Sequence, residues 1–332
     1  MNEKIIVSVV IPVLNEERYI SICIESLLKQ SFSISAMEWL FIDGGSTDAT
    51  KKILSEYRNK YGELIKILDN PNRIQASAMN IGIKNSNGKY IIRLDAHAEY
   101  DNEYIANCVK YLSVGDYDNV GGIAITKGRT SFGKIIAYMM SSKFGVGNSQ
   151  FRTSCSSGLV DTVPFGAFAR KTFEKYGLFD ERLGRNEDNE INYRIRKNGG
   201  KVFLSSSIKF TYYCRDTLGG ILKMAFQNGK WTIIASRLCP GSMGIRHLVP
   251  LLFVLSLILL TTLSFVSTWF VYFLLSEVTL YFALALFFSL KAKRNIGTII
   301  KLVFLFPLFH ISYGCGSLCG IVKTILGVSR KK

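Results

Sequence analysis

The sequence predicts an α/β domain built on a doubly wound, mostly parallel sheet, followed by an α-helical membrane region. In the first 236 residues, short apolar runs rich in β-forming residues alternate with stretches of helical periodicity. Two of these runs end in an aspartate, at Asp43 and Asp95. After residue 247 the chain is almost uninterrupted hydrocarbon up to Leu290. Strands that end in carboxylates predict a ligand site at the carboxyl edge of the sheet.

Four buried strands are expected before residue 100, over 5–12, 38–43, 65–68 and 90–94. Pro12 ends the first strand, and Asn15 is the expected N-cap of the helix that follows. The glycines and hydroxyl residues of 44–48 lead into a helix over 49–61. Farther along, we expect a strand over 120–125, a helix over 132–140 and a mobile loop over 145–158.

The composition divides the chain into two domains. We expect a first domain over residues 1–236, with halves at 5–112 and 113–236, and a membrane region over 237–332. The apolar stretch is long enough for two membrane spans, near 248–267 and 270–290. Basic residues on both flanks of this hairpin predict that its ends, and the first domain, lie on the cytoplasmic side. A third apolar segment, 296–328, precedes a basic tail, so re-entrant, interfacial and spanning arrangements all stay open.

The charge balance indicates an anionic partner. There are 41 lysines and arginines against 25 aspartates and glutamates, a net charge of +16. Phosphorylated substrates or an anionic membrane face would fit this surplus. No compact basic block is interleaved with aromatics, which argues against a nucleic-acid binder. The sequence also lacks the G-x-G-x-x-G and G-x-x-x-x-G-K-[ST] patterns, which argues against dinucleotide enzymes and P-loop NTPases.

Three groups of side chains are candidates for chemistry. Asp95 and His97 follow a predicted strand, and together they offer oxygen and nitrogen ligands for a divalent cation. The alternative is an aspartate that starts a turn and a histidine on a loop. Asp43 is placed to bond a base or ribose, or else to shape its own turn. Glu187 and Asp188 begin a predicted helix, where acidic residues often act only as dipole partners.

Three motifs in order resemble those of inverting family 2 glycosyltransferases of GT-A fold. They are VIPVLNE at 10–16, FIDGGSTD at 41–48 and LDAH at 94–97. The resemblance covers residues 5–235 and extends more loosely through 310–318. There it is similar to the membrane-anchored subgroup of bacterial exopolysaccharide (succinoglycan-type) enzymes. It implies a hexosyltransferase-type enzyme with a Rossmann-like mixed sheet.

The resemblance also implies roles for individual residues. In the family, the first aspartate of the strand-end motif binds sugar and diphosphate oxygens, and the third position, here His97, ligates Mg²⁺ or Mn²⁺. The start of the helix at 187–190 resembles the general-base motif, with Asp188 as base and Glu187 as its supporting carboxylate. The implied nucleotide-sugar-binding residues are Pro12, Val13, Asn15, Glu16, Asp43, Gly45, Arg73, Asn80, Asp95 and Ala96.

Two further places are expected to serve the sugar and the acceptor. Gly166 would let the backbone approach the sugar closely. A helix predicted over 218–234 carries Gln227, Lys230 and Trp231, which resemble the Q-x-x-R-W signature of membrane glycosyltransferases with lysine in place of arginine. Gln227 and Trp231 stand four residues apart, so both face one side of the helix. The alternative is that Trp231 is an interfacial anchor.

The resulting hypothesis is inverting transfer of a sugar from a nucleotide-diphospho-sugar to a polyprenyl-diphosphate-linked saccharide, in extracellular or capsular polysaccharide biosynthesis. The expected partners are the donor, the lipid-linked acceptor and membrane lipids, with no nucleic acid. The expected location is the cytoplasmic face of a bacterial cell membrane. The alternatives are a polyprenyl-phosphate sugar synthase, a processive polysaccharide synthase, which needs more spans, and a non-catalytic membrane-tethered saccharide-binding protein.

Overall fold

The computed structural model describes residues 4–153, 156–292 and 294–327. The chain forms two compact units. Unit 1 comprises Met1–Ile125 and Ser154–Tyr213, and unit 2 comprises Thr126–Thr153 and Cys214–Lys332. This division differs from the expected domains: the segment Thr126–Thr153 belongs to unit 2, and so does the helix Leu218–Leu238, which packs against the apolar helix Ile296–Ile325.

In the part of the chain that the structure describes, unit 1 is built on a mixed sheet of nine strands in the order β3-β2-β1-β4-β8-β6-β9-β5, with β7 beside β9. Strands β3, β2, β1 and β4 are parallel, whereas β8 runs antiparallel to β4 and β6. The strands are β1 (Val7–Val13), β2 (Met37–Asp43), β3 (Ile65–Asp69), β4 (Tyr90–Arg93), β5 (Ala98–Tyr100), β6 (Asn119–Lys127), β7 (Gly158–Leu159), β8 (Ala167–Ala169) and β9 (Val202–Tyr213). The predicted α/β class is confirmed.

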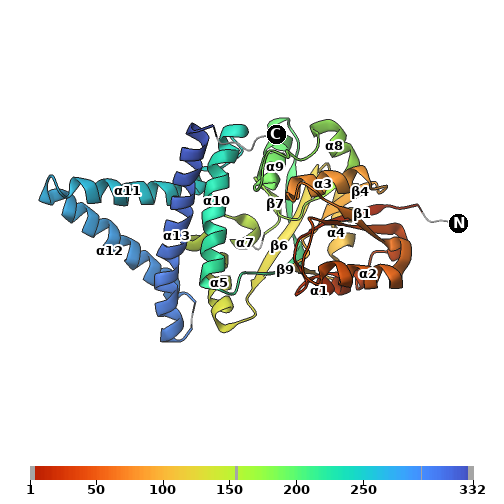
Figure 1. Cartoon of the computed structure of the whole chain (residues 1–332), viewed down its shortest axis with the longest axis horizontal. Coiled ribbons are helices and arrows are strands. Elements are labelled where there is room, and N and C mark those ends of the chain that lie inside the picture. The colour runs from red at the N-terminus through yellow and green to blue at the C-terminus, as the bar shows by residue number, and fades with distance from the viewer. Residues whose placement is uncertain (1–3, 154–155, 293, 328–332) are drawn as a thin grey trace. The chain divides into compact units, whose positions relative to one another are not determined.

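Helices cover both faces of this sheet. In Figure 1, α1 (Ile20–Leu28) and α2 (Thr50–Tyr61) lie on one face and α3 (Gln75–Lys84) on the other. The remaining helices of unit 1 are α4 (Tyr104–Val114), α8 (Arg170–Tyr176), α9 (Glu187–Lys197) and the 3₁₀ turns η1 (Ile34–Ala36) and η2 (Gly62–Leu64). The expectation that Asn15 caps the first helix is wrong. Tyr19 occupies the N-cap of α1, and Asn15 adopts a left-handed φ of 56° in the preceding loop.

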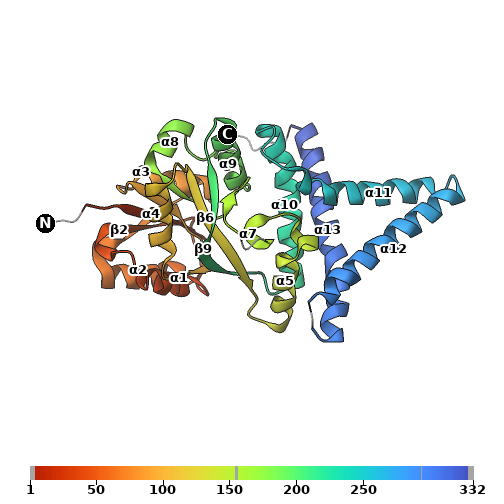
Figure 2. The ribbon, with the colours of Figure 1, turned by 180° about the vertical axis from the view of Figure 1, so that it is seen from behind.

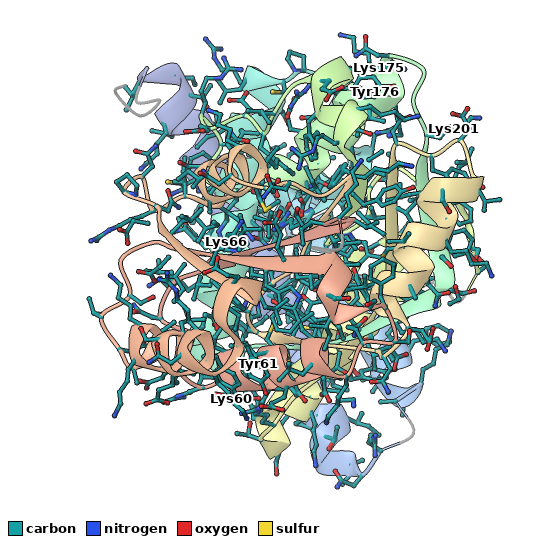
Figure 3. The ribbon with its side chains drawn as sticks, turned by 90° about the vertical axis from the view of Figure 1, so that its right-hand side faces the viewer. Lys60, Tyr61, Lys66, Lys175, Tyr176 and Lys201 are labelled. Atoms are coloured by element: carbon teal, nitrogen blue, oxygen red, sulfur yellow. The ribbon has the colours of Figure 1, made fainter. Side chains whose placement is uncertain are left out.

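The central strands are buried on both faces, as continuous apolar runs predict. The burial includes charged side chains, among them Glu38 of β2, which is 2% exposed. Its carboxylate accepts hydrogen bonds from Ser8 Oγ at 2.6 Å and from Lys66 Nζ at 2.7 Å, and Figure 3 labels Lys66. Because the three residues lie on β1, β2 and β3, this buried network fixes the amino ends of neighbouring strands.

Lysines of unit 1 are spread over its surface. In Figure 3, Lys60 lies at the lower end of the view and Lys175 at the upper end. Each ammonium stands over the ring of the tyrosine that follows it, 5.2 Å from Tyr61 and 4.7 Å from Tyr176. Each exposed ammonium therefore makes a cation–π contact with the neighbouring ring.

Unit 2 is helical. Its elements are α5 (Ser131–Ser141), α6 (Lys143–Val146), α7 (Gln150–Thr153), α10 (Leu218–Leu238), η3 (Ile245–His247), α11 (Val249–Leu263), α12 (Thr268–Leu290) and α13 (Ile296–Ile325). Figures 1 and 2 show α10 and α13 side by side, with α11 and α12 projecting from them as a hairpin. The loop expected over 145–158 instead contains part of α6 and all of α7, and its residues 154 and 155 lie outside the described residues.

Among the described residues, two helices of unit 2 are long and apolar enough to cross a membrane, α12 and α13. The span expected over 248–267 corresponds to α11, whose 15 residues measure about 22 Å, less than a hydrocarbon core of about 30 Å. The span expected over 270–290 coincides with α12. The third segment, expected over 296–328, forms one continuous helix, which does not fit the re-entrant alternative. The last residue of the expected segment, Val328, lies outside the described residues.

Glycines allow α10 and α13 to pack closely. A Cβ on Gly229 would stand 2.0 Å from the Tyr313 carbonyl oxygen, and one on Gly316 would stand 2.0 Å from that of Phe226. On α13, Gly320 faces the Lys230 carbonyl in the same way, at 2.6 Å. The glycine-bearing stretch 310–318 therefore has a packing reason: larger side chains would force the two helices apart.

Candidate active site

The carboxyl ends of three parallel strands bring the predicted motifs to one edge of the unit 1 sheet. Val13 at the end of β1 pairs with Asp43 at the end of β2. On the other side of β1, Val10 pairs with Arg93, the last residue of β4. Asp95 follows two residues later. This edge is where open α/β sheets bind ligands.

Asp43 is enclosed by the loop that follows it. Its carboxylate accepts hydrogen bonds from the backbone amides of Gly45 at 3.0 Å and Ser46 at 3.1 Å, and Lys51 Nζ lies 3.2 Å away. Only 1% of the residue is exposed. Burial alone would raise the pKa of Asp43, but the hydrogen bonds from Ser46 and Lys51 outweigh it and hold the pKa below its ordinary value. In this state the carboxylate shapes its own loop.

The loop after β1 is fastened to the loop after β2. Asn15 Oδ1 accepts a hydrogen bond from the Thr47 amide at 2.8 Å, and the Asn15 amide donates to Ser46 Oγ at 2.9 Å. Arg73, which is exposed, lies against Gly45: a Cβ there would stand 3.2 Å from its Nη2 atom. Pro12 and Val13 lie at the end of β1 itself. These predicted nucleotide-binding residues are therefore gathered at one edge.

Asp95 and His97 face one another, and each is held by a neighbour. Gln75 Nε2 donates to Asp95 Oδ1 at 3.0 Å, which leaves Oδ2 toward His97 Nε2, 3.9 Å away. The other ring nitrogen of His97, Nδ1, lies 3.1 Å from the Glu16 carboxylate. The edge of His97 also meets the Tyr212 ring at 5.5 Å between centroids. Ala96 between them is buried.

This arrangement fits a divalent cation. A metal-binding histidine commonly directs one ring nitrogen to the metal and the other to a carboxylate, and Glu16 provides that carboxylate. Among the described residues no group of three or more His, Cys, Asp or Glu side chains is placed to hold a metal. Asp95 and His97 would thus supply two ligands, and a cation here needs further oxygens from a ligand such as a diphosphate.

The base candidates lie at the start of α9, linked to the end of β4 by Arg93. Arg93 is 3% exposed and forms an ion pair between Nη1 and Asp188 Oδ1. Its Nη2 atom lies 3.2 Å from Glu187 Oε1 and 3.7 Å from Asp95 Oδ1. Glu187 has 5% of its side chain exposed and Asp188 has 25%. The more accessible carboxylate is the one expected to act as base.

Two expected site residues have other roles. Asn80 is buried; its amide donates to the Phe179 carbonyl and the Glu181 carboxylate, and its oxygen accepts from the Phe179 amide. Its hydrogen-bonding groups are therefore committed to the 179–181 segment instead of a nucleotide. Gly166 does allow a close approach, but the approaching group is Asn119, whose Oδ1 would stand 2.3 Å from an added Cβ.

Sequence reasoning missed Arg93 and Gln75. Arg93 carried a signal, because a charged residue inside the apolar run 90–94 must find partners when it is buried. Gln75 carried none, since a glutamine at the start of a helix is ordinary.

The acceptor candidates Gln227, Lys230 and Trp231 all lie on α10 of unit 2. Each is half-buried, and Lys230 Nζ stands 5.6 Å from the centre of the Trp231 ring. The expected spacing on one helix is confirmed. Their contact with an acceptor stays a prediction.

Comparison with known proteins identifies the family to which the chain belongs. The family model described as Glycosyl transferase family 2 matches residues 8–177. The chain is 30% identical over 248 residues to the succinoglycan biosynthesis protein ExoA of Rhizobium meliloti (strain 1021), covering 73% of this chain and 74% of that protein. It is 32% identical over 230 residues to the dolichyl N-acetyl-alpha-D-glucosaminyl phosphate 3-beta-D-2,3-diacetamido-2,3-dideoxy-beta-D-glucuronosyltransferase of Methanococcus voltae, covering 67% and 71%.

Among solved structures, the mannosyltransferase PcManGT of Pyrobaculum calidifontis, in complex with GDP-Man and Mn²⁺, is similar with a TM-score of 0.57 at 16% identity. The match covers 97% of this chain and 87% of that one. At that identity the likeness shows the fold, which is GT-A. The chain belongs to the family 2 glycosyltransferases and is a glycosyltransferase.

Proposed function

We propose that the protein transfers a sugar with inversion from a nucleotide-diphospho-sugar to a lipid-linked saccharide, with a polyprenyl diphosphate as the lipid carrier. The observation that carries the proposal is in unit 1: the Asp95–His97 pair and the Glu187–Asp188 pair lie at one sheet edge, joined by Arg93. The Asp95–His97 pair suits a diphosphate, and the Glu187–Asp188 pair suits proton removal. Binding the diphosphate and removing the proton are the two requirements of inverting transfer.

The donor would occupy the edge formed by the ends of β1, β2 and β4. The fastened loops after β1 and β2 offer Pro12, Val13, Asn15 and Gly45 to the nucleoside, with Arg73 beside Gly45. The exposed guanidinium of Arg73 suits a phosphate oxygen. Asp43 would serve the same pocket by holding its loop, with direct contact to the ribose as the role predicted from sequence.

Asp188 would take the proton of the acceptor hydroxyl as that oxygen attacks the anomeric carbon. The nucleoside diphosphate leaves from the opposite face, so a single displacement inverts the configuration and no covalent enzyme intermediate forms. Glu187, buried beside Asp188, supports it. Asp95 and His97 would hold Mg²⁺ or Mn²⁺, and that cation would neutralise charge on the leaving diphosphate.

The acceptor class rests on relatives and on unit 2. The name of one relative concerns succinoglycan, and that of another concerns a dolichyl-phosphate-linked sugar. α12 and α13 are candidate membrane spans, and basic residues such as Arg246 and Arg294 flank the apolar helices. We infer that the protein works at the cytoplasmic face of the membrane, where Gln227, Lys230 and Trp231 contact the acceptor.

A polyprenyl-phosphate sugar synthase is the second candidate. One curated relative is an undecaprenyl-phosphate 4-deoxy-4-formamido-L-arabinose transferase of Pectobacterium atrosepticum, 35% identical over 157 residues, which cover 47% of this chain. Such an enzyme would share the donor site and differ in its acceptor, a lipid monophosphate. The accessible base Asp188 suits an acceptor hydroxyl, which needs a base more than a phosphate does.

The experiment is a donor panel. The full chain in lipid nanodiscs is mixed with Mn²⁺ and each nucleotide-sugar, with either a lipid-linked saccharide extract or polyprenyl phosphate, and released nucleoside diphosphate is measured. We expect release with one donor that depends on the saccharide extract, and mass spectrometry of the lipid product gives the added sugar. Release only with polyprenyl phosphate favours the second candidate. No release with any donor contradicts both.

A further inference from the structure

The feature that the proposed mechanism leaves unexplained is Arg93. It lies at the end of a buried strand, yet its guanidinium faces the carboxylates Asp95, Glu187 and Asp188. One positive charge therefore stands among three acidic groups. We propose that Arg93 is a positioning residue that orients the general base Asp188, an inference that rests on the proposed function.

The contacts of Arg93 differ from those of an arginine that serves the fold. Arg170, on α8, donates to the backbone carbonyls of Gly88 and Ser86, both at 2.9 Å, and so ties chain segments together. The guanidinium of Arg93 instead faces acidic side chains. Its Nε atom is buried and has no hydrogen-bond partner among the described residues. A guanidinium placed only for stability would have its donors satisfied.

The geometry orients one carboxylate and leaves it open. Arg93 Nη1 binds Oδ1 of Asp188, whereas Oδ2 accepts no hydrogen bond from the part of the chain that the structure describes. The Asp188 side chain is 25% exposed. A planar guanidinium fixes the direction of a carboxylate better than a point charge does. One oxygen is therefore held and the other can face an acceptor hydroxyl.

Arg93 also connects the base to the donor side. The same Nη2 atom approaches Glu187 Oε1 at 3.2 Å and Asp95 Oδ1 at 3.7 Å. Asp95 and α9 come from distant parts of the sequence, and this guanidinium sets their separation. Because the attacking oxygen and the leaving diphosphate must lie on opposite faces of one carbon, a fixed separation favours the reacting geometry.

The test is a double-mutant cycle with Arg93→Met and Asp188→Asn, in the full chain and with the donor that the panel identifies. We expect Arg93→Met to lower kcat about 10- to 100-fold, and the double variant to match Asp188→Asn within about 2-fold. Arg93→Lys should recover part of the loss, since it keeps the charge without the fork. The KM for the donor, and the Kd for nucleoside diphosphate with Mn²⁺, should change less than about 3-fold.

Arg194→Met is the matched control. Arg194 lies on α9, the helix that carries Asp188. Arg194 pairs with Glu190 at 2.6 Å, and not with Asp95 or Asp188. We expect Arg194→Met to lower the thermal midpoint and leave kcat unchanged. In the double variant with Asp188→Asn, the changes in the thermal midpoint should add.

Several results would overturn the proposal. If the fold-losses of kcat from Arg93→Met and Asp188→Asn multiply in the double variant, Arg93 does not act through the base. Lost nucleotide binding would assign Arg93 to the donor site. If neither Arg93→Met nor Arg93→Lys folds, Arg93 is the structural counter-ion of buried Glu187. Full activity in the Asp188→Asn single variant would instead show that Asp188 is not the base. That result contradicts the proposed function, and the cycle distinguishes it from a failure of the Arg93 proposal.

Discussion

Asp43 and Asp95 stand at equivalent places, each at the carboxyl end of a parallel strand beside β1, yet the structure treats them differently. Asp43 is 1% exposed and its carboxylate is taken up by its own loop. Asp95 has one oxygen held by Gln75 and the other directed toward His97. The position in the sheet brings a carboxylate to the site. The next few residues decide whether that carboxylate stays available to a ligand.

The loops explain this difference. After Asp43, Gly45 has a φ of 82°, which turns its amide and that of Ser46 back onto the carboxylate. After Asp95, the chain continues into Ala96 and His97, and the Asp95 amide instead donates to the Tyr100 hydroxyl at 2.7 Å. The first carboxylate is satisfied by its own loop, whereas the second directs one oxygen toward His97 and is the one that we propose as a ligand of a cation.

The largest expected effect separates the two aspartates by activity. Asp95→Asn should lower transfer about 10²- to 10³-fold, because it removes a negatively charged ligand of the cation that would neutralise the leaving diphosphate. Asp43→Asn should lower it much less. The measurement is nucleoside diphosphate release by the full chain. Asp69→Asn is the matched control, since Asp69 ends β3 in register with Asp43 and is exposed.

Equal losses from Asp43→Asn and Asp95→Asn, with the folded state intact in both, would break the comparison. Asp43 would then contact the nucleotide directly, as the resemblance implies.

The second prediction concerns the cation. Chelation should abolish transfer, and His97→Ala should weaken Mn²⁺ binding about 10- to 100-fold, with Glu16→Gln weakening it less. Electron paramagnetic resonance counts bound Mn²⁺ with nucleoside diphosphate present, independently of turnover. Unchanged Mn²⁺ binding in His97→Ala would leave Asp95 as the sole protein ligand of the pair.

The third prediction concerns the enclosed loop. Asp43→Asn keeps one acceptor oxygen but loses the charge, so opening of the 44–48 loop should become easier by about 1 kcal/mol. Hydrogen exchange of a peptide that covers this loop should then speed up about 5-fold, with the peptide around Asp95 unchanged. Exchange that stays slow would show that Ser46 and Asn15 hold the loop without the carboxylate.

How far the sequence predicts this site follows from the same contrast. Strand ends and motif order predict that Asp43, Asp95, His97 and Asp188 lie at one edge of the sheet. The sequence can predict this because strand ends and motifs are features of local pattern. The enclosure of Asp43 and the commitment of Asn80 to residues 179–181 depend on tertiary hydrogen bonds. Such bonds leave no periodic signal. Arg93 lies between these cases, since its burial in an apolar strand predicts partners without naming them.

The apolar helices of unit 2 show the same limit. Hydropathy locates α12 well, but the helix ends of α11 depend on the turn at 264–267. α13 continues through Pro307, and beyond it glycines permit close contact with α10. A sequence in which every residue is apolar cannot distinguish a span from a packed helix.

The smallest expected effect is the pH dependence of the enclosed carboxylate. The pKa of Asp43 in the folded protein lies below its ordinary value, so the unfolded chain binds its proton first as the pH falls. The stabilisation is therefore present above the ordinary aspartate pKa of about 3.9 and is lost as the pH drops through the lower, folded value. The difference in thermal midpoint between the wild type and Asp43→Asn should shrink between pH 6 and pH 3.

Glu38→Gln is the comparison, because the pKa of Glu38 is also lowered: burial would raise it, but Lys66 and Ser8 outweigh that effect. A midpoint difference that stays constant would mean that the charge of Asp43 does not hold its loop.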